Sequence, residues 1–305
     1  MIIMPYYNLG DLIHFLNIDF YNISWNKKLN RLLDIISGLV NIHSVDIIHR
    51  DFHSGNIFFS YTAVIGDLGI SKSATESTDD NENYGIIPYM APEIFQRQKY
   101  TKASDIYSFG MIMWEFMTCR RPFWDRNHDT ELIIEICDGL RPPIVTNAPE
   151  GYIELMKECW HSDPNERPTA IDLYNKIKEM LSNEYSRKKN KNPTEIIESS
   201  DIGPVTMNNP GAIYKSRPLS GMIHSAISLR SSRSQSITSD DPFYYYQKNN
   251  MTSAVKRKFE DALIEKSNDN DNYTKEFELD INMNFNLSHN NEYITKEIDF
   301  DINAL

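Results

Sequence analysis

The sequence predicts a mainly α-helical domain over residues 1–181 and a largely disordered tail over residues 182–305. Two observations predict the domain. Apolar residues recur with helical spacing between Leu29 and Val40, and residues 104–117 are apolar on nearly every side of a helix, as in a buried one. A third observation predicts the tail. After Ser182 the chain becomes rich in polar and charged residues, which bury too little apolar surface to offset the entropy of folding.

The overall composition excludes several classes of protein. The 305 residues carry a formal net charge of −12, which argues against binding to a nucleic-acid backbone as the main activity. No stretch approaches eighteen uninterrupted apolar residues, so we expect no membrane span and no membrane partner. The three cysteines (Cys119, Cys137 and Cys159) form no CxxC pair, which indicates a reducing, cytoplasmic compartment.

Shorter patterns predict the remaining elements. Two brief apolar runs, residues 57–59 and 63–65, predict a small pair of strands. Amphipathic spacing predicts further helices over residues 11–16, 130–137, 150–160 and 169–181. Residues 71–83 are almost free of apolar side chains, which is typical of a surface loop. In the tail, residues 274–282 and 295–303 repeat one alternating pattern, which we interpret as duplicated low-complexity sequence in preference to a docking motif.

Residues 49–56, His-Arg-Asp-Phe-His-Ser-Gly-Asn, form a polar stretch between two apolar ones and are called the polar loop below. A loop held in this way presents reactive side chains on a rigid scaffold. Asp51 can accept or orient the proton of an attacking hydroxyl, and Asn56 can offer an amide oxygen to Mg²⁺. Taken alone, the octamer also fits an ordinary polar turn.

Other motifs follow the polar loop in a fixed order. They are Asp67-Leu68-Gly69, Ala91-Pro92-Glu93, Asp105 at the start of the buried helix, and Arg167 before Pro168. With the H-R-D-x-x-x-x-N spacing of the polar loop, they make residues 1–181 resemble the C-terminal lobe of the eukaryotic protein kinases, most similar to the tyrosine-kinase-like group. The resemblance implies a protein-kinase-like C-lobe, a helical bundle whose short β-hairpins carry the catalytic loop.

The resemblance also implies an activity. It is the transfer of the γ-phosphate of ATP, with Mg²⁺ as cofactor, to hydroxyls of a protein substrate in signal transduction. Serine or threonine is the expected acceptor, and tyrosine is an alternative. Asp51 would be the catalytic base, and Asn56 and Asp67 would hold Mg²⁺. Arg50 would pair with a phosphorylated residue, because guanidinium and phosphate match bidentately.

A further group of residues would bind the nucleotide. Met4 would lie beside the adenine, and Tyr7 would offer a backbone group to it. Phe58 would form part of the bottom of the adenine pocket. Asp11 would reach the ribose. A methionine such as Met4 is as readily explained as an ordinary core residue.

Three other motif residues would have structural roles. Glu93 and Arg167 resemble a buried ion pair, and Asp105 resembles an acid that receives backbone N–H groups of the catalytic loop. Leu68 replaces a phenylalanine of the family and is expected to fill an apolar position.

The sequence also departs from the family. It contains no Gly-rich loop and no V-A-I-K lysine, so we expect that the N-lobe is missing from this chain, which would be a truncated kinase of uncertain activity. His53 replaces a lysine that is usual in serine/threonine kinases. The alternative is a non-catalytic scaffold, a pseudokinase or half-kinase, that binds protein partners, through the tail among other surfaces. A small-molecule kinase fits less well, because the Ala91-Pro92-Glu93 segment and Asp105 favour a protein substrate.

Overall fold

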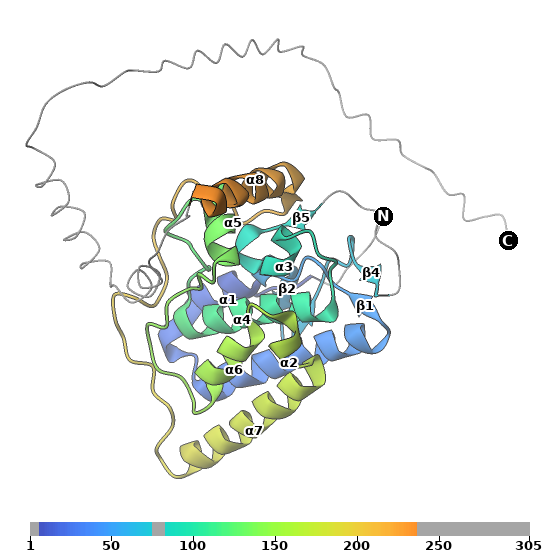
Figure 1. Cartoon of the computed structure of the whole chain (residues 1–305). Coiled ribbons are helices and arrows are strands. Elements are labelled where there is room, and N and C mark those ends of the chain that lie inside the picture. The colour runs from blue at the N-terminus through green and yellow to red at the C-terminus, as the bar shows by residue number, and fades with distance from the viewer. Residues whose placement is uncertain (1–5, 75–82, 237–305) are drawn as a thin grey trace, which may run out of the picture. The chain divides into compact units, whose positions relative to one another are not determined.

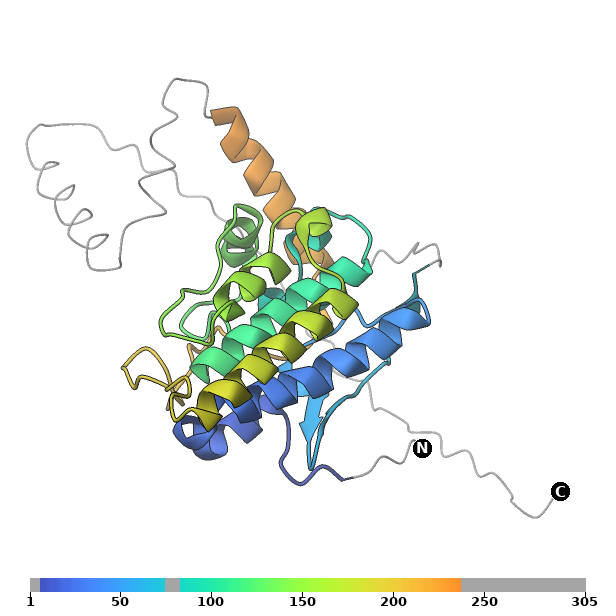
Figure 2. The same cartoon turned by 90° about the horizontal axis from the view of Figure 1, so that it is seen from below.

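The computed structural model describes residues 6–74 and 83–236, which form a helical bundle (Figure 1). Helix α2 (Trp25–Ser44) packs along α7 (Ala170–Lys189), and α4 (Lys102–Thr118) contacts both α2 and α6 (Tyr152–Cys159). Seen from below, α2, α4 and α7 run side by side (Figure 2). The predicted helix-rich fold is therefore confirmed. No helix of the described residues is both long and apolar enough to cross a membrane.

Helix α4 forms the centre of the core. Every residue of it from Ser104 to Thr118 is buried, which confirms the prediction from its all-round apolar pattern. Gly110 lets α6 approach closely, since a Cβ atom at this position would lie 2.9 Å from the Cβ of Cys159. The elements attached to α4 consequently rest on a buried helix.

Shorter elements surround these helices. The helical ones are α1 (Leu12–Asp19), η1 (Phe20–Asn22), η2 (Ser54–Asn56), η3 (Ile87–Tyr89), α3 (Pro92–Phe95), α5 (Thr130–Cys137) and η4 (Pro164–Glu166). The described strands form antiparallel pairs: β1 (Ile47–Ile48) with β4 (Lys72–Ser73), β2 (Ile57–Phe59) with β3 (Ala63–Ile65), and β5 (Tyr84–Gly85) with β6 (Arg217–Pro218). The predicted strands 57–59 and 63–65 are thus confirmed.

The chain after residue 181 differs from the sequence prediction. Helix α7 continues to Lys189, and the following residues return to the bundle and end in α8 (Ser220–Ser236), which packs on α5 (Figure 1). The expectation of a disordered tail is therefore wrong for residues 182–236. Ile202, Leu219 and Ile223 anchor this part and are 3%, 0% and 1% exposed. Residues 237–305, with both repeats, lie outside the described residues.

Glu93 and Arg167 form a buried ion pair, as the sequence predicts. Arg167 donates from Nη1 to Oε1 of Glu93 (2.7 Å) and from Nη2 to Oε2 (2.8 Å). Arg167 also donates to the carbonyls of His161 and Ala103. The bidentate geometry ties α3 to the segment before α7, and the extra hydrogen bonds satisfy the guanidinium.

A second buried polar group lies beneath the polar loop. Glu115, on α4, accepts hydrogen bonds at Oε1 from the hydroxyls of Tyr89 (2.5 Å) and Ser54 (3.1 Å). Burial raises the pKa of Glu115 to about 8, although the bond from Tyr89 acts in the opposite direction. Its Oε2 is buried without a hydrogen-bond partner among the described residues, which disfavours a negative charge on this carboxyl group.

We expect Arg167→Ala to reduce the free energy of unfolding by about 3–5 kcal/mol, because it leaves the Glu93 carboxylate buried and uncompensated. Urea denaturation measures this. The control is Lys176→Ala, which removes an exposed pair with Glu158 and should cost less than about 1 kcal/mol. Equal losses in the two variants would contradict a structural role for the buried pair.

We expect Glu115→Gln to change how stability depends on pH. The pKa of Glu115 is about 8 in the folded state and about 4.5 unfolded, so the folded state holds a proton between these values. The stabilisation from that proton is complete below about pH 4.5 and is lost as the pH rises to about 8. Relative to Glu115→Gln, the wild type should therefore lose up to about 1.4 kcal/mol per pH unit in this range.

Urea denaturation at a series of pH values measures this difference. The matched control is Glu179→Gln, which alters an exposed glutamate on α7 and should follow the wild type. A wild type and a Glu115→Gln variant with parallel pH profiles would rule out the buried neutral carboxyl.

Candidate functional site

The polar loop is fixed to the start of α4 by one carboxylate. Asp105 is 1% exposed and accepts the backbone N–H groups of His49 (2.9 Å) and Arg50 (3.0 Å). Its Oδ2 is also 2.8 Å from Nε2 of His43 on α2. Three donors satisfy this buried charge, and the role predicted for Asp105 from the sequence is confirmed.

Two residues of the site have left-handed backbone conformations. Arg50 has a φ of 70° and Asp67 has a φ of 56°, values that a non-glycine residue adopts at a cost of about 1–3 kcal/mol. The N–H of Arg50 is bonded to Asp105, and Oδ1 of Asp67 accepts the N–H of Gly69 (3.2 Å). Strained residues of this kind concentrate at functional sites, and these two flank the same group of polar side chains.

Asp51 is the central acid of the site. Its side chain is 11% exposed, and Oδ2 accepts the hydroxyl of Ser216 at 2.6 Å. Oδ1 lies 3.5 Å from Nε2 of His53. Burial raises the pKa of Asp51, but the contacts with His53 and Ser216 outweigh it and hold this pKa below its ordinary value. At neutral pH Asp51 is therefore an ionised acceptor.

The hydrogen bonds of His53 define its tautomer. Nδ1 accepts the backbone N–H of Gly55 (3.1 Å), so a neutral imidazole carries its proton on Nε2. Nε2 faces both Asp51 and the hydroxyl of Ser216, which is 3.4 Å away. His53 thus presents an N–H group to the same place that Asp51 presents a carboxylate.

Asn56 and Asp67 are brought together by the β2–β3 hairpin. The Asn56 amide donates to the carbonyl of Asp51 (2.9 Å), and the backbone carbonyl of Asn56 accepts the N–H of Gly66 (2.8 Å), directly before Asp67. Gly66 has to be small, since a Cβ atom there would lie 2.8 Å from the Phe58 ring. Asp51 and Asn56 are consequently joined by a hydrogen bond, and Asp67 directly follows a residue whose N–H is bonded to the backbone of Asn56.

The chemistry of these groups suits a hard cation. The bond from Asn56 to Asp51 uses the amide nitrogen and turns the amide oxygen the other way, while Asp67 contributes an exposed carboxylate. Oxygen donors of this kind bind Mg²⁺, which usually keeps few protein ligands and takes others from phosphate and water. No cluster of three or more His, Cys, Asp or Glu side chains lies within the described ranges, so a dedicated all-protein metal cage is not found there.

Of the predicted nucleotide-binding residues, Phe58 belongs to β2, and Tyr7 and Asp11 lie next to this strand. The backbones of Leu9 and Gly10 are hydrogen-bonded to Phe59, and the rings of Tyr7 and Phe58 stack with centroids 5.8 Å apart. Asp11 caps α1 by accepting the N–H of His14 (2.8 Å). Met4 lies outside the described residues. The segment before α1 is therefore joined to the strand that follows the polar loop.

The predictions for Leu68 and Arg50 have different outcomes. Leu68 is 51% exposed, so the expectation that it fills an apolar position is wrong for this structure. Arg50 lies over the ring of Tyr100, 4.6 Å from its centroid, and the Tyr100 hydroxyl donates to the carbonyl of Tyr84. Arg50 thus contacts a tyrosine that is bonded to the residue at the start of β5, and its pairing with phosphate stays a prediction.

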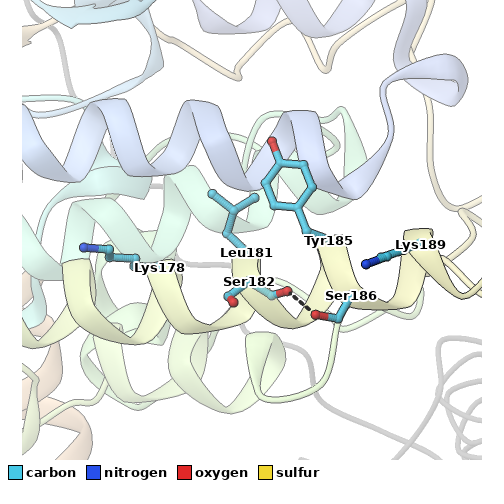
Figure 3. Close-up of a pocket in the computed structure, with 6 residues that line it drawn as sticks. All are labelled: Lys178, Leu181, Ser182, Tyr185, Ser186 and Lys189. Atoms are coloured by element: carbon cyan, nitrogen blue, oxygen red, sulfur yellow. Dashed lines mark hydrogen bonds between the residues drawn. The ribbon is translucent and has the colours of Figure 1, made fainter.

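A separate hollow of about 390 Å³ lies along α7. All of its lining residues belong to that helix (Figure 3): Lys178, Leu181, Ser182, Tyr185, Ser186 and Lys189. It includes none of the predicted site residues, so the hydrogen-bonded unit around Asp51 is the better candidate for a functional site.

Sequence reasoning did not find Ser216. This serine lies in a part of the chain that was assigned to a disordered tail, 165 residues from the acid it contacts. A weak local signal was present, because Leu219, Ile223 and Ala226 have helical spacing and all are buried in the structure. Nothing in the local sequence ties this short apolar stripe to the polar loop.

Comparison with known families assigns the fold. The model of the protein tyrosine and serine/threonine kinase family matches residues 1–177. A putative serine/threonine-protein kinase/receptor of Acanthamoeba polyphaga mimivirus is 35% identical over 53% of this chain. The probable serine/threonine-protein kinase roco6 of Dictyostelium discoideum is 35% identical over 60% of it. The dual specificity protein kinase shkE of the same organism is 33% identical over 51% of it.

The matches cover a small share of these relatives. They span 10% of the mimivirus protein, 10% of roco6 and 23% of shkE. The residues matched by the family model, 1–177, include the polar loop, the Asp67 motif and the Glu93–Arg167 pair. Since the family model covers more than half of the 305 residues, the chain belongs to the protein tyrosine and serine/threonine kinase family.

Proposed function

We propose that this chain is a protein kinase that transfers the γ-phosphoryl group of ATP to a serine or threonine hydroxyl of a protein. The observation that carries the proposal is the 2.6 Å contact between the Asp51 carboxylate and a serine hydroxyl. A general base acts over this distance, about 2.6–3.2 Å between heavy atoms. The lowered pKa of Asp51 keeps the carboxylate ready to accept the hydroxyl proton at neutral pH.

The roles of the other residues follow from their positions. Asn56 and Asp67 would hold Mg²⁺, which when bound neutralises the charge of the nucleotide phosphates. His53 offers Nε2–H beside the acceptor hydroxyl and orients it toward Asp51. Tyr7, Asp11 and Phe58, with Met4, would contact the nucleoside. The serine at Asp51 supports serine or threonine as the acceptor, and tyrosine is less supported.

The first test is Asp51→Asn in the 305-residue chain. Phosphate transfer from labelled ATP to an added protein substrate should fall by at least about 100-fold, because the variant lacks the general base. Since these residues include no Gly-rich loop, weak nucleotide binding is expected and the assay uses millimolar ATP and Mg²⁺. Calorimetric titration with MgATP should give similar affinities for the wild type and the variant.

The matched control is Asp201→Asn, which changes an exposed aspartate and should transfer phosphate at the wild-type rate. Equal transfer by Asp51→Asn and the wild type would remove Asp51 from the reaction. A wild type that binds protein partners but neither binds nor uses MgATP would favour the non-catalytic scaffold.

A further inference from the structure

Residues 211–219, called the return segment below, cross the face of the lobe that carries the polar loop. Arg217 and Pro218 form β6, which pairs with Gly85 and Tyr84 of β5 in antiparallel register. The N–H of Leu219 extends this pairing by donating to the carbonyl of Asn83 (2.8 Å). An added strand of this kind fixes a chain by its main-chain bonds. Ser216 directly precedes the paired residues, so its position is fixed as well.

Side chains hold the other side of the return segment. Ile213 donates its N–H to Nδ1 of His128 (3.1 Å), and the carbonyl of His128 accepts a bond from Nη2 of Arg217 (2.7 Å). The Tyr214 hydroxyl donates to the carbonyl of Pro122 (2.9 Å), while the guanidinium of Arg121 lies over its ring. The return segment is therefore anchored before and after Ser216.

The anchored serine meets the reactive side chains of the polar loop. Its hydroxyl donates to Oδ2 of Asp51 at 2.6 Å and lies 3.4 Å from Nε2 of His53. A hydroxyl bonded to a carboxylate at this distance has a charge-assisted hydrogen bond. The oxygen of Ser216 is positioned as a nucleophile whose proton already points at a base.

We infer that Ser216 is a phosphoacceptor of its own chain, modified within the same molecule by the polar loop. This inference rests on the proposed function and names a substrate for the same site. The Oγ–P bond forms as the bond between the γ-phosphorus and the bridging oxygen of the nucleoside triphosphate breaks. The Ser216 proton passes to Asp51 and then to solvent, and the nucleoside diphosphate leaves with Mg²⁺.

Electrostatic repulsion determines how this modification would affect the contact between Ser216 and Asp51. A phosphoserine carries a charge of about −1.5 to −2 at neutral pH, and here it would lie against the Asp51 carboxylate. Like charges at such a distance repel, and the phosphorylated serine no longer has the hydroxyl proton that it donated to Asp51. Phosphorylation of Ser216 therefore weakens the contact between the return segment and the polar loop, which frees Asp51 for other substrates.

The test is to incubate the full chain, first dephosphorylated, with Mg²⁺ and ATP and to map phosphate by mass spectrometry. We expect phosphate on Ser216 in the wild type, retention of a phosphorylated site in Ser216→Thr, and none at that position in Ser216→Ala. Because the reaction is intramolecular, its half-time should not change over a tenfold dilution of the chain. Asp51→Asn should slow it at least about 100-fold.

Ser225 serves as an internal control, because it is exposed on α8 and bonds only to the carbonyl of Gly221 among the contacts described for it. It should stay unmodified on the time scale of Ser216. The same reactions contain an added protein substrate, which reports the proposed function independently.

The outcomes separate the two proposals. Phosphate on the added protein but not on Ser216 overturns the present inference and leaves the proposed function standing. Modification of Ser216 at a rate proportional to chain concentration overturns the intramolecular step. Phosphate on neither overturns the proposed function, and this inference with it.

Discussion

The geometry of the site depends on the Asp105 carboxylate. This buried acid sits in the first turn of α4, where the helix dipole favours a negative charge, and it receives two backbone N–H groups of the polar loop. Hydrogen bonds to a charged group contribute about 1.5–3 kcal/mol each, which is comparable to the cost of the left-handed conformation at Arg50. A helix that is buried along almost its whole length thus fixes the backbone directly before Asp51.

A buried hydrogen-bonded cluster is a second constraint on the polar loop. Ser54, Tyr89 and Glu115 share one hydrogen-bonded cluster that joins the loop, η3 and α4. Burial keeps Glu115 protonated near neutral pH, so the cluster adds no second negative charge beside Asp51. Asp51 belongs to the polar loop and Glu115 is hydrogen-bonded to it through Ser54, and the surroundings of the two acids account for their different pKa shifts.

Local patterns in the sequence predicted the parts of this fold that depend on local interactions. The burial of α4, the short strands β2 and β3 and the bounds of α5 follow from spacing within a few residues. The Glu93–Arg167 pair and the role of Asp105 could be predicted because ordered motifs imply their partners. The exposure of Leu68 could not be predicted, since it depends on what packs against that side chain.

The ordered structure of the return segment could not be predicted from the sequence for a related reason. Its stability depends on sheet pairing with β5 and on contacts with His128 and Pro122, all distant in sequence. The average composition of this region is dominated by its polar residues. It therefore does not reveal the few apolar residues, such as Leu219, that are buried in the structure. Disorder inferred from composition is a statement about mean burial, and specific contacts of this kind are not visible to it.

Because Ser216 occupies Asp51, the binding of another hydroxyl at Asp51 is linked to the release of the return segment. Any other hydroxyl that is to reach Asp51 has to displace the return segment, so its apparent affinity is reduced by the fraction of molecules in which the segment has left. If that fraction were about 1%, the apparent affinity would fall about 100-fold without any change in the site itself. Under the proposed function, specificity for a protein substrate would thus depend on how firmly β6, Tyr214 and Arg217 hold the chain's own serine, as well as on the residues that touch the substrate.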